Sequence, residues 1–255
     1  MLKNVTHLRD FALRALDGEI GKVDQFYFDD ETWAIRYLVV NTGSWLSGRQ
    51  VLISPFALGQ TDWESKQLEV LLTRKQVEGS PDINTHKPVS RQHEADHLEY
   101  YGYPFYWEGP YLWGSMTDPA GLAMQTSLVP EGSASRVGTE PADSHLRSTN
   151  VVTGYHIEAT DGEIGHVEDF IVDTYTWAIQ YIEVNTRNWW RGKKVLMSPH
   201  WIERVSWTDS KIYVDLSRET IKNSPEYVEP VTRDSEKAYW LQGTEQPYSP
   251  KVTRD

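Results

Sequence analysis

The pattern with the clearest chemical meaning is His93-Glu94-Ala95-Asp96-His97, which matches H-E-x-x-H. On a helix, the two histidines would lie one turn apart and could share a zinc ion, with the glutamate as general base. The flanking sequence is polar, and Tyr100 stands where the extended zinc-protease pattern has glycine. We therefore expect a solvated segment, with His93 and His97 as the only metal candidates. A metal-dependent hydrolase through His93, Glu94 and His97 is kept as an alternative.

An aromatic run follows this motif over residues 99–114, where eight of sixteen residues are aromatic. Tyrosine and tryptophan are effective interface anchors, and their rings also stack on bases or sugars. Three readings stay open: the run packs back onto the protein, contacts a partner, or stacks on a ligand. Its candidate interaction residues are Tyr103, Phe105, Tyr106, Trp107 and Trp113.

Two loops carry further aromatic candidates. The first loop has Trp45 and Leu46, and the second has Trp189, Trp190 and Arg191. A basic, aromatic loop could touch an anionic membrane or a nucleic acid. Because the whole chain is acidic, such a loop would be only a local patch. Half-burial against neighbouring elements is favoured, and peripheral membrane contact is the alternative.

Composition excludes several classes of protein. Lys and Arg total 25 against 37 Asp and Glu, giving a formal net charge of −12, so no nucleic-acid partner is expected. The absence of cysteine excludes disulfides, cysteine-ligated metals and a thiol nucleophile. We see no secretory signal and no membrane-length apolar run, which favours a cytoplasmic protein. No cofactor-binding motif is found, and none is expected.

The chain contains an internal repeat with an offset of 144 residues. The segment Asp17–Gly21, DGEIG, returns as Asp161–Gly165, and 29 of 67 positions from 15 to 81 are identical without a gap. Two homologous domains follow from this identity. Residues 84–147, between the copies, are aromatic in their first part and rich in Ser, Gly and Pro later, which is typical of a partly flexible linker.

Each copy reads as a series of short strands with little helix. In the first copy a strand is expected before Asp17, then at 21–28, 33–41 and 49–54, a hairpin at 58–63 and 67–72, and a helical turn at 73–79. Gly18 and Gly21 suit a tight hairpin with positive φ.

Some residue types in these strands have structural readings. The tryptophan pairs Trp33/Trp177 and Trp63/Trp207 are expected in the core. Asp17 and Asp161 are expected to support their turns. The acidic groups at 29–31 and 168–169 are expected to be solvated.

The three motifs of each copy, in this order, resemble the PRC-barrel family. That family includes the cytoplasmic domain of the photosynthetic reaction-centre H subunit and the C-terminal domain of a ribosome maturation factor. The motifs lie at Asp17–Val23, Trp33–Val40 and Trp45–Pro55, and again at Asp161–Val167, Trp177–Val184 and Trp189–Pro199. The resemblance covers about 80 residues per copy. The second copy departs from it at Glu183, which replaces Val39, and at Met197, which replaces Ile53.

The resemblance implies an all-β fold of two small barrels, and the repeat predicts that a pseudo-twofold axis relates them. The expected domains are 1–83 and 148–230, with the aromatic linker, including short helical pieces, at 84–147 and a tail at 231–255. The family serves as an adaptor without general enzymatic activity. We therefore expect a bacterial, non-enzymatic binding, scaffold or regulatory module, with an unidentified protein partner or self-association. An accessory factor of photosynthetic or membrane electron transport is the alternative that the resemblance adds.

Overall fold

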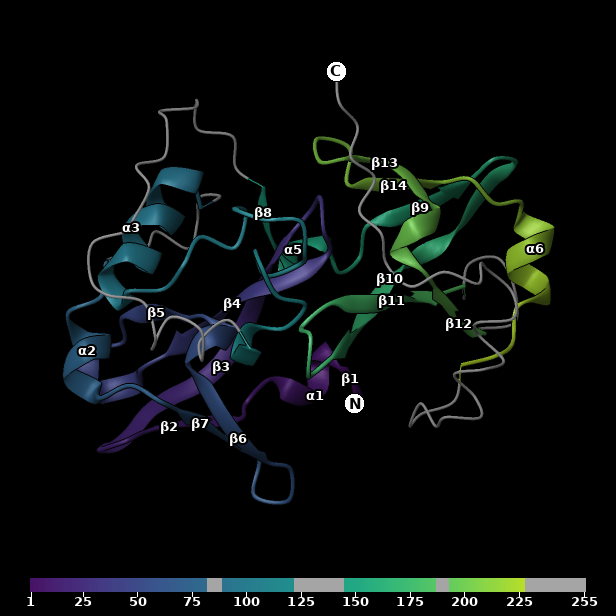
Figure 1. The fold of residues 1–255 in the computed structure, drawn as a ribbon. Helices are drawn as coiled ribbons and strands as arrows, with labels where there is room; N and C mark the ends of the chain where they lie inside the picture. Colours follow the sequence, from purple (N-terminus) through teal and green to yellow (C-terminus); the bar gives the residue numbers. More distant parts are fainter. Residues whose placement is uncertain (82–88, 122–144, 187–192, 228–255) are drawn as a thin grey trace. The chain divides into compact units, whose positions relative to one another are not determined.

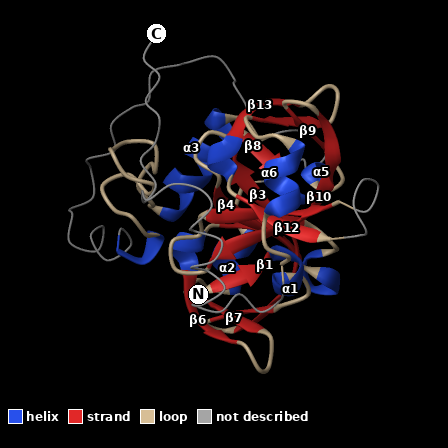
Figure 2. Ribbon diagram, turned by 90° about the vertical axis from the view of Figure 1, so that its right-hand side faces the viewer, coloured by secondary structure: helices blue, strands red, loops and turns tan. Residues whose placement is uncertain are grey.

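A computed structural model describes residues 1–81, 89–121, 145–186 and 193–227. The chain divides into two compact units, each of which is discontinuous in sequence (Figure 1). Unit 1 comprises Met1–Thr6, Val151–Asp173 and Ile179–Asp255, and unit 2 comprises His7–Asn150 and Thr174–Ala178. Strands predominate in both units, and the helices between them are short (Figure 2). The expectation of a mostly-β fold is confirmed.

Unit 2 is built on a seven-stranded sheet with the order β5-β4-β3-β2-β7-β6, in which β8 pairs with β3 outside this path. All of its pairings are antiparallel except β2 with β7, which is parallel. The strands are β2 (Ala12–Ala15), β3 (Gly18–Asp29), β4 (Ala34–Asn41), β5 (Gln50–Ile53), β6 (Leu58–Asp62), β7 (Gln67–Val70) and β8 (Leu146–Ser148).

Unit 1 has a second seven-stranded sheet, with the order β12-β11-β10-β9-β14-β13 and β1 paired with β10. This is the same order of equivalent strands, and β3 and β10, for example, are 144 residues apart. The strands are β1 (Leu2–Asn4), β9 (His156–Ala159), β10 (Gly162–Asp173), β11 (Ile179–Asn185), β12 (Lys194–Met197), β13 (Ile202–Ser206) and β14 (Lys211–Val214).

The first strand of each repeat belongs to the sheet of the other repeat. β1 opens the first repeat but pairs with β10 of unit 1, with Lys3 opposite Val172. β8 opens the second repeat but pairs with β3 of unit 2, with Arg147 opposite Phe28. The units therefore do not follow the continuous ranges expected from the sequence, because this pairing is non-local.

The described α-helices are short and flank the strands. They are α1 (Val5–Leu8), α2 (Arg74–Glu78), α3 (Arg91–Tyr101), α5 (Thr149–Val152) and α6 (Arg218–Asn223). Three 3₁₀ turns complete the described chain: η1 (Gly43–Leu46), η2 (Pro55–Ala57) and η3 (Pro199–Trp201). Within these ranges, each helix is too short or too polar to cross a lipid bilayer.

The turn residues of the DGEIG motif have a defined role in both units. Gly21 has φ of 144°, and a Cβ added there would lie 2.1 Å from the Asn41 carbonyl oxygen, so the position requires glycine. The Asp17 carboxylate accepts a hydrogen bond of 2.7 Å from the Arg74 backbone N–H at the start of α2. Asp161 and Arg218 repeat this contact at 2.7 Å. Asp17 and Asp161 thus satisfy the first donor of a helix, beyond the turn role that we expected.

The repeated tryptophans divide into two groups. Trp33 and Trp177 are buried, and Trp33 stacks on Phe28 with ring centroids 5.1 Å apart, which confirms them as core residues. Trp63 and Trp207 are only half-buried. Trp63 packs edge-on against Phe11 with ring centroids 5.8 Å apart, and Trp207 lies 6.2 Å from Tyr155. Because both tryptophans stay partly exposed, the core expectation is wrong for this pair.

Candidate functional site

The H-E-x-x-H motif lies on α3 of unit 2. The Ser90 hydroxyl accepts a hydrogen bond of 3.3 Å from the His93 backbone N–H and caps the helix. Gly102, in the left-handed conformation, ends it. Glu94 and His97 are buried, so the expectation of a solvated segment is wrong. The helix buries polar residues, which a search for apolar flanks cannot detect.

The Glu94 carboxyl group is fully buried and held by two side chains. The Tyr106 hydroxyl donates a hydrogen bond to it, and the Arg91 guanidinium lies 3.4 Å from its Oε1 atom. Burial raises the pKa of Glu94 to about 7, although Arg91 and Tyr106 act in the opposite direction. A carboxyl group with such a pKa can bind and release a proton near neutral pH. The groups that contact Glu94, however, are Tyr106 and Arg91 of the protein itself.

The His97 ring is also buried, and one of its nitrogens is committed. Nε2 lies 3.0 Å from the Leu52 carbonyl oxygen, which can only accept, so Nε2 carries the proton and Nδ1 does not. Burial lowers the pKa of His97 to about 4, which keeps the ring neutral at physiological pH. Its edge contacts Tyr37 and Tyr101, with centroids 5.1 and 5.0 Å away.

A metal site needs more ligands than this motif provides. Among the residues that the structure describes, no group of three or more His, Asp or Glu side chains could hold a metal ion. His93 is half-buried, and its Nε2 atom is enclosed without a hydrogen-bond partner. The motif therefore has the helical spacing of a zinc site without a third ligand in the described chain.

Arg36 lies at the centre of a polar cluster beneath α3 that also contains Asp29, Glu94 and Tyr106, and it was not among the residues predicted from the sequence. Its guanidinium lies 3.8 Å above the Tyr106 ring and 4.7 Å from that of Trp113. It donates a 2.7 Å hydrogen bond to the Leu112 carbonyl oxygen and lies 3.6 Å from Asp29. Arg36, on the buried strand β4, thus connects the aromatic run to the sheet. Its sequence signal was a charged residue within the otherwise mostly apolar segment WAIRYLVVN.

Asp29 corrects another expectation. It is buried rather than solvated, and its Oδ1 atom accepts hydrogen bonds of 3.0 and 3.1 Å from the backbone N–H groups of Glu31 and Thr32. Asp169 of unit 1, also expected to be solvated, is buried too. Both carboxylates are placed in strands whose neighbours supply hydrogen-bond donors.

The aromatic run packs onto unit 2, which is one of the three readings left open. Phe105, Tyr106 and Trp113 are buried, whereas Tyr103 and Trp107 are half-buried. The Trp113 indole N–H donates a 2.7 Å hydrogen bond to the Thr176 carbonyl oxygen of the same unit. Most of the run's candidate interaction surface is therefore used inside the protein.

The Trp45 loop borders a hollow of about 490 Å³ in unit 2. Trp45 and Leu46 are half-buried, as favoured from the sequence. The Trp45 indole donates a 2.6 Å hydrogen bond to the Ile20 carbonyl oxygen, and Arg74 lies 4.4 Å over its ring. Three carboxylates and one cation line the hollow: Asp10, Glu19, Asp24 and Lys22. The candidates Trp189, Trp190 and Arg191 of the second loop lie outside the described residues.

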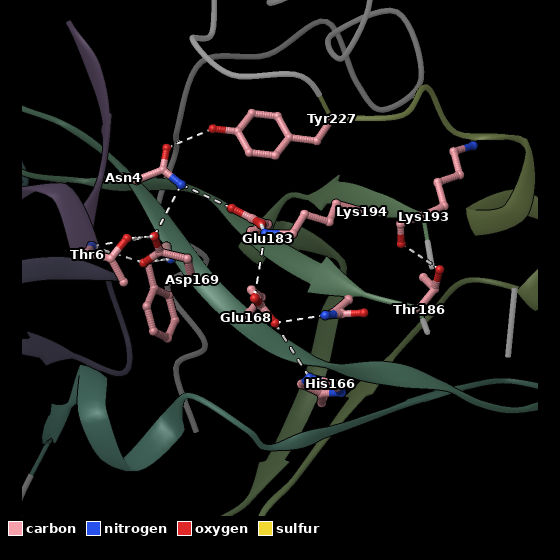
Figure 3. A network of polar contacts seen from close by, with 12 residues as sticks. Asn4, Thr6, His166, Glu168, Asp169, Glu183, Thr186, Lys193, Lys194 and Tyr227 are labelled. Carbon is pink, nitrogen blue, oxygen red and sulfur yellow. Dashed lines mark hydrogen bonds and ion pairs between the residues drawn. The ribbon is translucent and has the colours of Figure 1, made fainter. Parts of the chain in front are cut away.

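Unit 1 contains a second polar cluster, which is partly buried and which we call the Asn4 network (Figure 3). It consists of Asn4, Thr6, Asp169, Glu183, Lys194 and Tyr227. The departure at Glu183 was its only sequence signal, because the partner Asn4 comes from a strand 179 residues away.

No protein-family model matches the chain, and neither does any curated protein.

Proposed function

We propose that the chain is a non-enzymatic tandem PRC-barrel protein that acts as a binding or scaffold module. The order of the three motifs in each repeat and the equal strand order of the two sheets support this proposal. In it, each sheet closes into a small barrel and the second repeat arose from the first by duplication. The pseudo-twofold relation expected from the repeat stays a prediction.

The proposal rests on the contacts of Glu94 and His97 in unit 2, the two buried residues whose types could do acid–base or metal chemistry. Glu94 accepts from Tyr106 and pairs with Arg91, while His97 donates to the main chain of β5. A general base needs access to a substrate proton, and a nucleophile or metal needs an open position. Side chains committed in this way favour a structural role over a hydrolytic one.

The Trp45 hollow gives the proposed module a surface with a definite character. A half-buried indole supplies an anchor for a partner, and carboxylates outnumber cations around it. Such a surface favours a partner segment that presents lysine or arginine. We therefore place the proposed docking site here and expect a basic partner.

The first test of this function reverses the charge of the hollow. Native full-length protein is used as bait, and captured proteins are identified by mass spectrometry. The Glu19→Lys/Asp24→Lys variant is expected to lose at least about tenfold of the basic partner, because complementary charges set both association rate and specificity. Glu64→Lys, which adds the same kind of charge at an exposed position outside the hollow, is the control. Equal capture by both variants would contradict the proposed surface.

The hydrolase alternative is tested by titrating the protein with zinc in a calorimeter. We expect no binding heat at micromolar zinc, because His97 is neutral but enclosed and no third ligand is present in the described ranges. One-to-one binding that disappears in His93→Ala and His97→Ala would support a metal site instead.

A further inference from the structure

The exchanged strand β1 is held in unit 1 by its side chains as well as by its backbone (Figure 3). The Asn4 amide donates hydrogen bonds of 3.2 Å to Asp169 and 3.0 Å to Glu183. Its oxygen accepts a 2.7 Å hydrogen bond from the Tyr227 hydroxyl. Donors and acceptor of this buried amide are thus all engaged, which fixes its orientation.

Thr6, two residues after Asn4, contacts the same carboxylate, that of Asp169. Both its backbone N–H and its hydroxyl donate to Asp169. On the other side, Lys194 places its ammonium group 2.5 Å from Glu183 and balances part of the buried negative charge. The site therefore forms hydrogen bonds with an amide at position 4 and with a hydroxyl at position 6.

The equivalent site of unit 2 is built for different residues. At an offset of 144, Gln25 and Val39 stand in place of Asp169 and Glu183. The exchanged strand β8 accordingly presents Ser148, whose hydroxyl donates to the Gln25 side chain, and Arg147, which lies 2.7 Å from Asp30.

What the two sites share is apolar. Leu146 packs with Val39 and Leu52 in unit 2, while Leu2 packs against Leu196 in unit 1. A leucine at this position can be buried in either site, so we attribute discrimination between the two strands to the polar residues.

We propose that unit 1 carries a strand-binding site specific for residues 2–6, in which Asp169, Glu183 and Tyr227 select the side chains of Asn4 and Thr6. The occupant is this chain's own β1, and β8 is rejected. In the unit 2 site, the Asn4 amide would keep an acceptor in Gln25 but would face Val39 in place of Glu183, so one of its two N–H donors would have no acceptor. In the unit 1 site, Ser148 would leave two carboxylates without the Asn4 amide. The exchange of first strands is thus a selective interaction between the two repeats and does not depend on the proposed function.

The test is a thermal-unfolding cycle on the full-length chain. Asn4→Ser gives β1 the residue of β8 and is expected to lower the melting temperature by about 5 °C. In a background where Asp169→Gln and Glu183→Val copy the unit 2 site, the same change is expected to cost less than about 1 °C. The reciprocal variant Ser148→Asn is expected to destabilise unit 2. Equal costs of Asn4→Ser in both backgrounds would overturn the proposal.

A second measurement covers the case in which the altered background does not fold. In the otherwise unchanged full-length chain, hydrogen exchange of the β1 amides reports release of this strand from β10. Asn4→Ser with Thr6→Asn is expected to speed this exchange at least about tenfold, since exchange follows the population in which β1 is released. Ser148→Asn is the control and should leave exchange of the β1 amides unchanged. An unchanged exchange rate with Asn4→Ser and Thr6→Asn would overturn the proposal.

Discussion

Replacing Arg36 with glutamine is expected to lower the free energy of unfolding by about 3 to 5 kcal/mol. The guanidinium is buried and pairs with Asp29, which is buried as well. Its removal leaves this carboxylate without a cation and the Leu112 carbonyl oxygen without its donor. Glutamine is also the residue at the equivalent position of unit 1, Gln180, so the variant places in the first repeat the residue that the second repeat has.

The loss also includes the aromatic run, because Arg36 lies over Tyr106 and Trp113. A desolvated cation–aromatic contact contributes about 2 kcal/mol, and part of this is included in the loss given above. In Arg36→Gln we therefore expect α3 and the aromatic run to unfold before the rest of unit 2. Hydrogen exchange should show this as lost protection of the α3 amides before those of β4.

Urea unfolding followed by circular dichroism measures the loss. Arg14→Gln, the same change at an exposed position on β2 of unit 2, is the matched control and should stay within about 0.5 kcal/mol of wild type. Arg36→Gln combined with Asp29→Asn should recover part of the loss, because the second change removes the unpaired charge. Behaviour of Arg36→Gln like that of Arg14→Gln would show that the buried pair is not stabilising.

The strands of each unit were predictable because their signals are local. The expected strand at 33–41 is β4 (Ala34–Asn41), and the expected hairpin is β6 and β7, each within a few residues. These segments combine β-branched and aromatic residues with clear turns, and the helical turn at 73–79 has a Thr73 capping box.

Pairings between distant segments had no such signal. β1 is three residues long and pairs with β10, more than 160 residues later. A periodicity cannot be read from three residues, and neither can a partner at that separation. The polar cluster beneath α3 was missed for a related reason. The helix buries Glu94 and His97, whose types are those of a solvated face, and their partners Arg36 and Tyr106 lie on other segments.

Glutamine at position 94 is expected to change how stability depends on pH. Burial raises the pKa of Glu94 from 4.5 to about 7, so the folded state binds this proton more tightly than the unfolded state. The stability due to Glu94 is therefore fully present below pH 4.5 and is lost as the pH rises through 7. A shift of this size corresponds to about 3 kcal/mol.

His97 produces the opposite slope. Burial lowers its pKa from 6.5 to about 4, so stability due to His97 is present above pH 6.5 and is lost as the pH falls through 4. Between pH 4.5 and 6.5 the two slopes oppose each other. In the wild type, the contribution of this pair to the free energy of unfolding is therefore nearly independent of pH in that window. Each single variant reveals the pH dependence of the other residue.

The measurement is the free energy of unfolding from pH 4 to 8 for wild type and for Glu94→Gln, His97→Gln and the double variant. We expect Glu94→Gln to gain stability from pH 4 to 6.5 and to hold it at pH 8, and His97→Gln to lose stability from pH 4.5 to about 7 and to change little from there to pH 8. The double variant should be flat relative to wild type in the shared window. Glu19→Gln, an exposed carboxyl in the same unit, controls for the change in net charge. A Glu94→Gln curve parallel to wild type at every pH would mean that Arg91 and Tyr106 keep Glu94 ionised in the folded state, with burial costing the carboxylate little.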